Sequence, residues 1–154
     1  LGADRNYRKI EGTWMTLFSR GRDVLGLGIS GGTDLGSNAP YYDQCRLGGL
    51  FNMSAYRTAQ LIGREYLFGV MQYRRRFADI SRAFGTGIYA GASLEAGNVF
   101  KRLDNTPTKG ALYAGSLFVG IDSKLGPVYL GYGLSEGGHS AWYLYIGSSL
   151  QTIR

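Results

Sequence analysis

Two overlapping glycine patterns in the first third of the chain contain residue types that could do chemistry. Residues 28–32 read Gly-Ile-Ser-Gly-Gly and match the nucleophile elbow, which needs Ser30 on a sharp turn between a strand and a helix. The spacing of Gly26, Gly28 and Gly31 also matches a dinucleotide fingerprint, in which a helix N-terminus binds the pyrophosphate. The segment 33–40 is rich in turn-forming residues and predicts a loop, not a helix. We therefore expect no catalytic residue and no cofactor.

Residues that could bind a metal ion or act as paired carboxylates are scattered along the chain. His139 is the single histidine and lies in a glycine turn, and Cys45 is the single cysteine. A structural metal site needs a cluster of such ligands, so we expect no metal. For Glu95 we expect an ion pair with an arginine of a neighbouring strand. The glutamates fall in separate segments and predict no paired-carboxylate site; they are Glu11, Glu65, Glu95 and Glu136.

Composition and charge restrict the class of protein. The 154 residues include 25 glycines, 12 tyrosines and three prolines, with a net charge of +6. The aromatic content argues against a disordered chain. No run of roughly 18 apolar residues occurs, which excludes a transmembrane helix, but a transmembrane strand needs only about 9–11 residues. The positive charge fits either nucleic acid or an arginine-lined polar interior with loops at lipid head groups.

Apolar and polar residues alternate with a period of two through most of the chain, which is typical of β-strands. Turn-forming residues separate the alternating stretches, as at Gly126-Pro127 and over 136–139. The segment 45–54 fits either a strand or part of a loop. The predicted strands are about 6–19, 22–32, 45–54 (if it is a strand), 64–77, 84–99, 110–124, 127–136 and 140–150.

Most of these strands have one row of large apolar side chains and one row of small or polar ones. A soluble sheet would cover its outer face with charge, whereas tryptophan and tyrosine near the ends of an apolar row are typical of a membrane interface. The opposite row would face a polar lumen, with Ser93 and Glu95 as members. The residues expected to face lipid are Leu25, Leu27, Ile29, Leu67, Met71, Ile88, Leu94, Leu117, Val119, Val128, Leu130, Trp142, Leu144 and Ile146.

Residues 47–56 read Leu-Gly-Gly-Leu-Phe-Asn-Met-Ser-Ala-Tyr, and Tyr-Arg-Arg follows at 73–75. In order and spacing, these motifs and the tail 126–147 resemble the C-terminal barrel region of patatin-like outer-membrane proteins, in the bacterial surface antigen (outer-membrane assembly and translocation) superfamily. The resemblance implies the second half of a larger barrel, with 33–63 as a loop inside the lumen. The wider superfamily has an arginine where this chain has Ser54. The loop residues it singles out are Leu47, Gly48, Gly49, Asn52, Ser54 and Tyr56.

The sequence therefore predicts an all-β protein: an antiparallel, up-and-down transmembrane β-barrel or half-barrel of seven or eight strands. Residues 1–154 form one domain, and we expect a fragment or C-terminal part of a longer protein, since no Met or signal peptide begins it. Seven or eight strands could close alone, or pair with missing strands or a second copy of the chain.

The predicted function is a scaffold in the bacterial outer membrane, not an enzyme. Its expected partners are lipopolysaccharide or phospholipid, with no nucleic acid. The resemblance implies that it anchors, and could help to translocate or present, a patatin-like lipid-hydrolase domain. The alternative is a soluble basic β-barrel that binds single-stranded nucleic acid or a lipid-like ligand.

Overall fold

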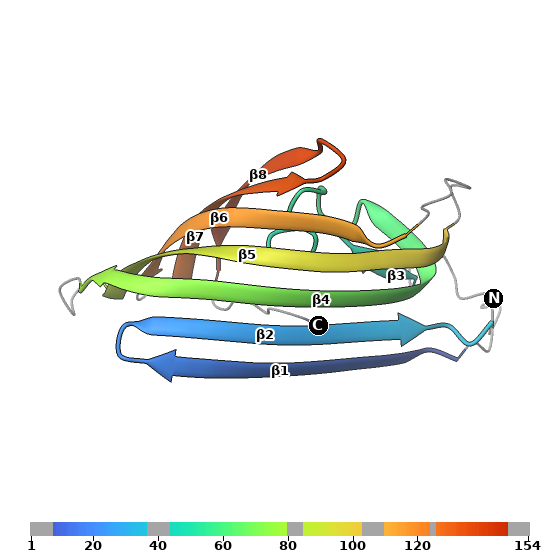
Figure 1. Ribbon diagram of the computed structural model, residues 1–154, viewed down its shortest axis with the longest axis horizontal. Helices are drawn as coiled ribbons and strands as arrows, with labels where there is room; N and C mark the ends of the chain where they lie inside the picture. Colours follow the sequence, from blue (N-terminus) through green and yellow to red (C-terminus); the bar gives the residue numbers. More distant parts are fainter. Residues whose placement is uncertain (1–7, 37–43, 80–84, 103–109, 124–125, 148–154) are drawn as a thin grey trace, which may run out of the picture.

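The computed structural model describes residues 8–36, 44–79, 85–102, 110–123 and 126–147. Within these ranges the chain forms eight β-strands and no helix (Figure 1). The strands are β1 (Ile10–Arg20), β2 (Asp23–Thr33), β3 (Cys45–Leu47), β4 (Leu61–Ala78), β5 (Gly85–Arg102), β6 (Leu112–Ser123), β7 (Gly126–Ser135) and β8 (Ser140–Ile146).

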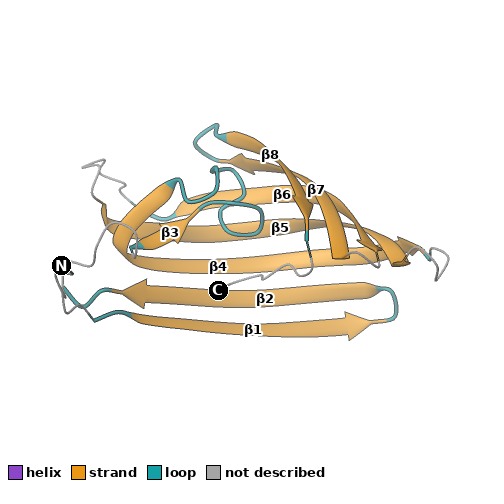
Figure 2. Cartoon of the chain, turned by 180° about the vertical axis from the view of Figure 1, so that it is seen from behind, coloured by secondary structure: helices purple, strands orange, loops and turns teal. Residues whose placement is uncertain are grey.

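The long strands form one antiparallel, up-and-down sheet in the order β1-β2-β4-β5-β6-β7-β8. The short β3 lies off this path and pairs with the start of β4, where Leu47 is opposite Leu61. The sheet curves but does not close, because β1 and β8 are edge strands in the described part of the chain (Figure 1, Figure 2). The all-β, antiparallel, up-and-down prediction is confirmed. A barrel closed by this chain alone is not what the described strands form.

The predicted strand positions agree with the structure to within a few residues, except at 45–54. There the strand covers only Cys45–Leu47, and residues 48–60, which we call the inner loop, have no strand. The long loop predicted over 33–63 corresponds to the connection between β2 and β4, which contains β3; residues 37–43 of it lie outside the described residues. Parts of four predicted strands, at 6–7, 84, 124 and 148–150, lie outside the described residues.

The two shortest connections between neighbouring strands lie at one end of the sheet and the two longest at the other. Only Gly21 and Arg22 separate β1 from β2, and Gly21 has a φ of +60°, which glycine adopts without steric cost. Two residues also separate β6 from β7 at this end, which we call the short-turn end. The longest connections, 34–60 and 103–111, lie at the opposite, long-loop end.

The buried core lies between the inner loop and one face of the sheet, which we call the inner face. Figure 2 shows the loop across the strands on this side. Phe51 of the loop packs edge-on against Phe118 of β6, with ring centroids 4.7 Å apart, and also contacts Tyr129 of β7. A neighbouring cluster of buried residues comprises Leu47, Met53, Ala55, Tyr56, Leu61, Phe68, Val70, Val99 and Ala114. The core is therefore one-sided, and the outer face of the sheet contributes little to it.

Two adjacent residues of β6 test this one-sided core. Phe118 is 3% exposed and Leu117 is 69% exposed. We expect Phe118→Ala to lower the free energy of unfolding by about 3–5 kcal/mol, because a large buried ring is lost. Leu117→Ala should change it by no more than about 0.5–1 kcal/mol. Urea-induced unfolding of the two variants measures both values, and equal losses would contradict a core on the inner face.

Candidate functional site

The outer face of the sheet has a continuous apolar surface built by strand register. In each strand, residues of one parity point outward, and pairing places them side by side. One cross-strand row includes a residue from each of the seven long strands: Phe18, Leu25, Tyr73, Ala92, Leu117, Tyr132 and Trp142.

All fourteen residues predicted to face lipid lie on this outer face. Leu25, Leu27 and Val128 are half-buried, and the remaining eleven are exposed, from Ile88 at 37% to Trp142 at 71%. Further exposed apolar side chains lie beside them, among them Trp14, Phe18, Phe100, Tyr113, Ile121 and Leu134. Isolated exposed leucines are ordinary on a soluble protein, but a contiguous surface of this kind marks an interaction face.

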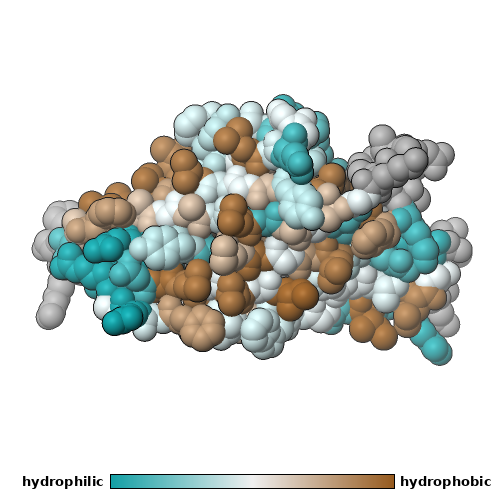
Figure 3. Space-filling model, viewed as in Figure 1, coloured by the Kyte–Doolittle hydropathy of each residue, from teal (hydrophilic) through white to brown (hydrophobic). Residues whose placement is uncertain are grey.

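Hydrophilic residues lie toward both ends of this surface (Figure 3). At the short-turn end, Arg75 is 3.5 Å from Asp23, and Asp23 also accepts a hydrogen bond from the Tyr73 hydroxyl at 2.6 Å. At the long-loop end, the Lys101 ammonium is 2.6 Å from the Glu65 carboxylate. The apolar surface, which we call the belt, therefore has a polar border at each end of β4.

The height of the belt follows from β4. Its outward residues are apolar or aromatic from Leu67 to Tyr73, between Glu65 and Arg75. A strand rises about 3.3 Å per residue, so the distance from Glu65 to Arg75 is roughly 33 Å along the strand. At the tilt of about 35–45° common in membrane barrels, this corresponds to a height close to the roughly 25 Å of their apolar bands.

The inner loop is held together by its own backbone. Gly48 N donates to Asn52 O at 2.8 Å, and Gly49 N donates to Tyr56 O at 3.0 Å. Phe51 and Met53 have φ values of +63° and +66°, in a region that residues with a Cβ rarely adopt. Both side chains are almost fully buried against the sheet, and this burial offsets the local strain.

A buried carboxylate on β5 fixes the tip of the inner loop. The Glu95 carboxylate accepts hydrogen bonds from Ser54 N, Ser54 Oγ and Ser93 Oγ, each at 2.5 Å. The Ser93 hydroxyl is 2.7 Å from Ser116 Oγ. Since the Ser93 proton is committed to Glu95, Ser116 is the donor in that pair. The four side chains are each 5% exposed or less, so this network is buried.

Small residues on β7 and a tyrosine on β8 complete the loop site. A Cβ at Gly133 would overlap the Ser54 carbonyl, and one at Gly131 would lie 2.7 Å from a Leu50 methyl group. Glycine at these positions lets the loop approach the backbone of β7. The Tyr143 hydroxyl donates to the carbonyl of Tyr56.

Sequence reasoning located part of this site. Ser93 and Glu95 face inward, and the six predicted loop residues, Leu47, Gly48, Gly49, Asn52, Ser54 and Tyr56, lie in or directly before the inner loop. The prediction that Glu95 pairs with an arginine was wrong. Serine donors surround the carboxylate, and no described arginine forms a salt bridge with it. Ser116 and Tyr143 were missed, although each has the inward parity of its strand.

The residues considered for chemistry lie in unrelated places. Ser30 is in the middle of β2, paired with Thr13 and Phe68, where the turn of a nucleophile elbow is not formed. The His139 ring lies 5.1 Å from the Tyr56 ring. Among the described residues, no group of three or more His, Cys, Asp or Glu side chains is placed to hold a metal ion.

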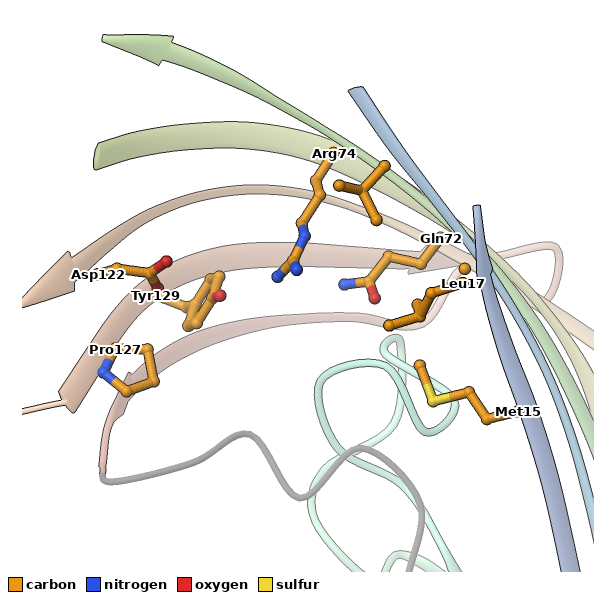
Figure 4. Close-up of a pocket in the computed structure, with 9 residues that line it drawn as sticks. Met15, Leu17, Gln72, Arg74, Asp122, Pro127 and Tyr129 are labelled. Atoms are coloured by element: carbon orange, nitrogen blue, oxygen red, sulfur yellow. The ribbon is translucent and has the colours of Figure 1, made fainter. Parts of the chain in front are cut away.

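A cavity of about 330 Å³ lies on the inner face toward the short-turn end (Figure 4). Arg74 and Gln72 of β4 extend into it from one side, and Met15 and Leu17 of β1 form an apolar wall. The Arg74 guanidinium lies 5.6 Å from the centre of the Tyr89 ring. This part of the inner face offers hydrogen-bond donors beside an apolar wall.

Comparisons with protein-family models, with curated proteins and with solved structures found no match for the chain. Within the described ranges there is no helix with the length and apolarity required to span a membrane.

Proteolysis can test whether the Glu95 carboxylate holds the inner loop against the sheet. Glu95→Ala leaves three buried donors without an acceptor, at a cost of about 1–3 kcal/mol per group. We expect the inner loop to open more often, so that trypsin cleaves after the exposed Arg57 at least roughly tenfold faster. Glu136→Ala, in an exposed turn, is the matched control. Wild-type cleavage rates in Glu95→Ala would show that the carboxylate does not hold the loop.

Proposed function

We propose that the chain is a membrane-embedded scaffold of a bacterial outer membrane, with its outer face in contact with lipid. One observation carries the proposal: exposed apolar side chains occur on the outer face of all seven long strands, and on β4 they lie between charged residues at both ends. Burying a leucine or isoleucine side chain is worth about 1.5–3 kcal/mol. A surface with this many exposed large apolar side chains is stable beside acyl chains and unfavourable in water.

The backbone supports the same proposal. Hydrocarbon offers no hydrogen bonds, so a membrane-spanning sheet needs every donor and acceptor paired. In the described residues, β2, β4, β5, β6 and β7 each pair with a strand on both sides, whereas β1 and β8 are edge strands and the short β3 pairs only with β4. In a membrane these edges require partner strands, supplied by the rest of a longer polypeptide or by a second copy of the chain.

The proposed role is to anchor an attached domain and to help present or translocate it. The resemblance to patatin-like outer-membrane proteins favours a lipid hydrolase as that domain, with no catalytic role for this chain. The inner loop suits a scaffold, because it covers part of the inner face with a hydrogen-bonded, well-packed plug. Lipopolysaccharide and phospholipid are the proposed contacts of the outer face.

A charge placed in the middle of the belt discriminates a membrane scaffold from a soluble basic barrel. Leu94 is 61% exposed at the centre of β5. In a membrane, Leu94→Arg should cost about 2–4 kcal/mol and reduce insertion into phospholipid vesicles, measured by heat-modifiable migration on a gel. In a soluble protein the same exposed substitution would be neutral.

Glu136→Arg, in the exposed β7–β8 turn, controls for added charge and should insert like the wild type. Ready solubility of the folded wild-type chain without detergent, with salt-sensitive binding of single-stranded DNA, would support the soluble alternative and overturn the proposal.

A further inference from the structure

The outer face contains a hollow of about 440 Å³ toward the long-loop end. Its floor is formed by Gly69 of β4 and Ala96 of β5, which are paired in the sheet. Bulkier side chains surround the floor: Ile29 of β2, which is paired with Gly69, together with Leu67 and Phe100. The alternation of small and large residues therefore produces a recess within the apolar belt.

The hollow is apolar because the polar groups of its one amide side chain, Asn98, already form hydrogen bonds within the protein. The Asn98 amide donates to Gly110 O at 2.5 Å, and its carbonyl oxygen accepts from Val99 N at 2.8 Å. Asn98 is 5% exposed, so its polar atoms contribute little to the surface of the recess. A ligand in this hollow would meet methyl, methylene and aromatic groups.

A charged group lies at the border of the hollow. Glu65 is the outward residue that precedes Leu67 on β4, and it accepts hydrogen bonds from Lys101 Nζ at 2.6 Å and Thr33 Oγ1 at 3.3 Å. Lys101 follows Phe100 in the chain, and its side chain is 57% exposed. An ammonium group has three donors, and Glu65 takes one of them. Two donors therefore remain for an anionic group.

We propose that this hollow binds an acyl chain of a phospholipid whose phosphate contacts Lys101. The inference rests on the proposed membrane function and deepens it by naming a lipid site. Phe100, which lines the hollow, is followed in the chain by Lys101, so an acyl chain in the recess would place its phosphate toward this ammonium group. Lys101 and Glu65 form the charged border of the belt, and in the proposed membrane this border is at the level of lipid head groups. Its volume is in the range of small-ligand sites, roughly 300–1,000 Å³.

Two variants fill the hollow without disturbing the sheet. A Cβ at Gly69 would meet only carbonyl oxygens at 3.8 and 3.9 Å, which are ordinary contacts, so Gly69→Leu can extend into the recess. Ala96→Leu fills it from β5. Ala92→Leu adds the same side chain to the outer face of the same strand, four residues away from Ala96, and is the matched control.

The test is native mass spectrometry of the folded chain in detergent micelles that contain palmitoyl-oleoyl phosphatidylglycerol. We expect the wild type and Ala92→Leu to retain one lipid, and Gly69→Leu and Ala96→Leu to bind it at least roughly tenfold more weakly. Lys101→Gln should weaken binding about three- to tenfold, because the phosphate loses an ammonium partner. Heat-modifiable migration of every variant verifies that it is folded.

Equal lipid retention by the wild type and both filled variants would overturn the site, as would no retention by the wild type. Preferential retention of lipopolysaccharide would assign the hollow to a different lipid and also overturn the inference. These failures are distinct from failure of the proposed function. If the membrane function is wrong, Leu94→Arg inserts like the wild type. If only the lipid site is wrong, Leu94→Arg still reduces insertion.

Discussion

The inner side of the sheet is defined by one buried carboxylate. Glu95 is 3% exposed and accepts three hydrogen bonds at 2.5 Å, two of them from Ser54 of the inner loop. A charge of this kind is tolerated away from water only when its acceptor sites are satisfied. The loop tip is therefore fixed on the face that contains Glu95. Because side chains alternate along a strand, the opposite parity must point away from the loop, and that parity has the large apolar residues.

Because Glu95 fixes the inner loop on one face, the large apolar residues of the other face are left exposed, unlike those of a soluble sandwich. In a sandwich, the apolar faces of two sheets pack together and charges cover the outside. Here Phe51, Phe118 and Tyr129 give the inner face a compact core, while Leu94, Leu117 and Leu144 on the outer face are each more than 60% exposed. Charged residues occur at the two ends of the outer face, and glycines on β7 make room for the loop on the inner face. The arrangement suits the proposed curved wall, which has lipid on its outer face and the inner loop on its inner face.

Sequence periodicity predicted the strands and their facing, because a period of two depends only on local backbone geometry. It placed Leu94 outward and Glu95 inward, as the structure has them. It did not find the partner of Glu95. Ser54 is 41 residues away in sequence, and its contact depends on how the inner loop folds over β5. Of the segment 45–54, which fitted either a strand or a loop, only Cys45–Leu47 is a strand. The rest is loop for a related reason, since the left-handed φ angles of Phe51 and Met53 are held by burial that local sequence does not encode.

The central claim is that the outer face contacts acyl chains, and the two native tryptophans can test it without substitution. Trp14 and Trp142 both lie on the outer face and are 58% and 71% exposed. When the chain is reconstituted in vesicles, phospholipids brominated on the acyl chain should quench this fluorescence, and aqueous iodide should have little effect. Strong quenching by iodide together with no response to brominated lipid would contradict the account.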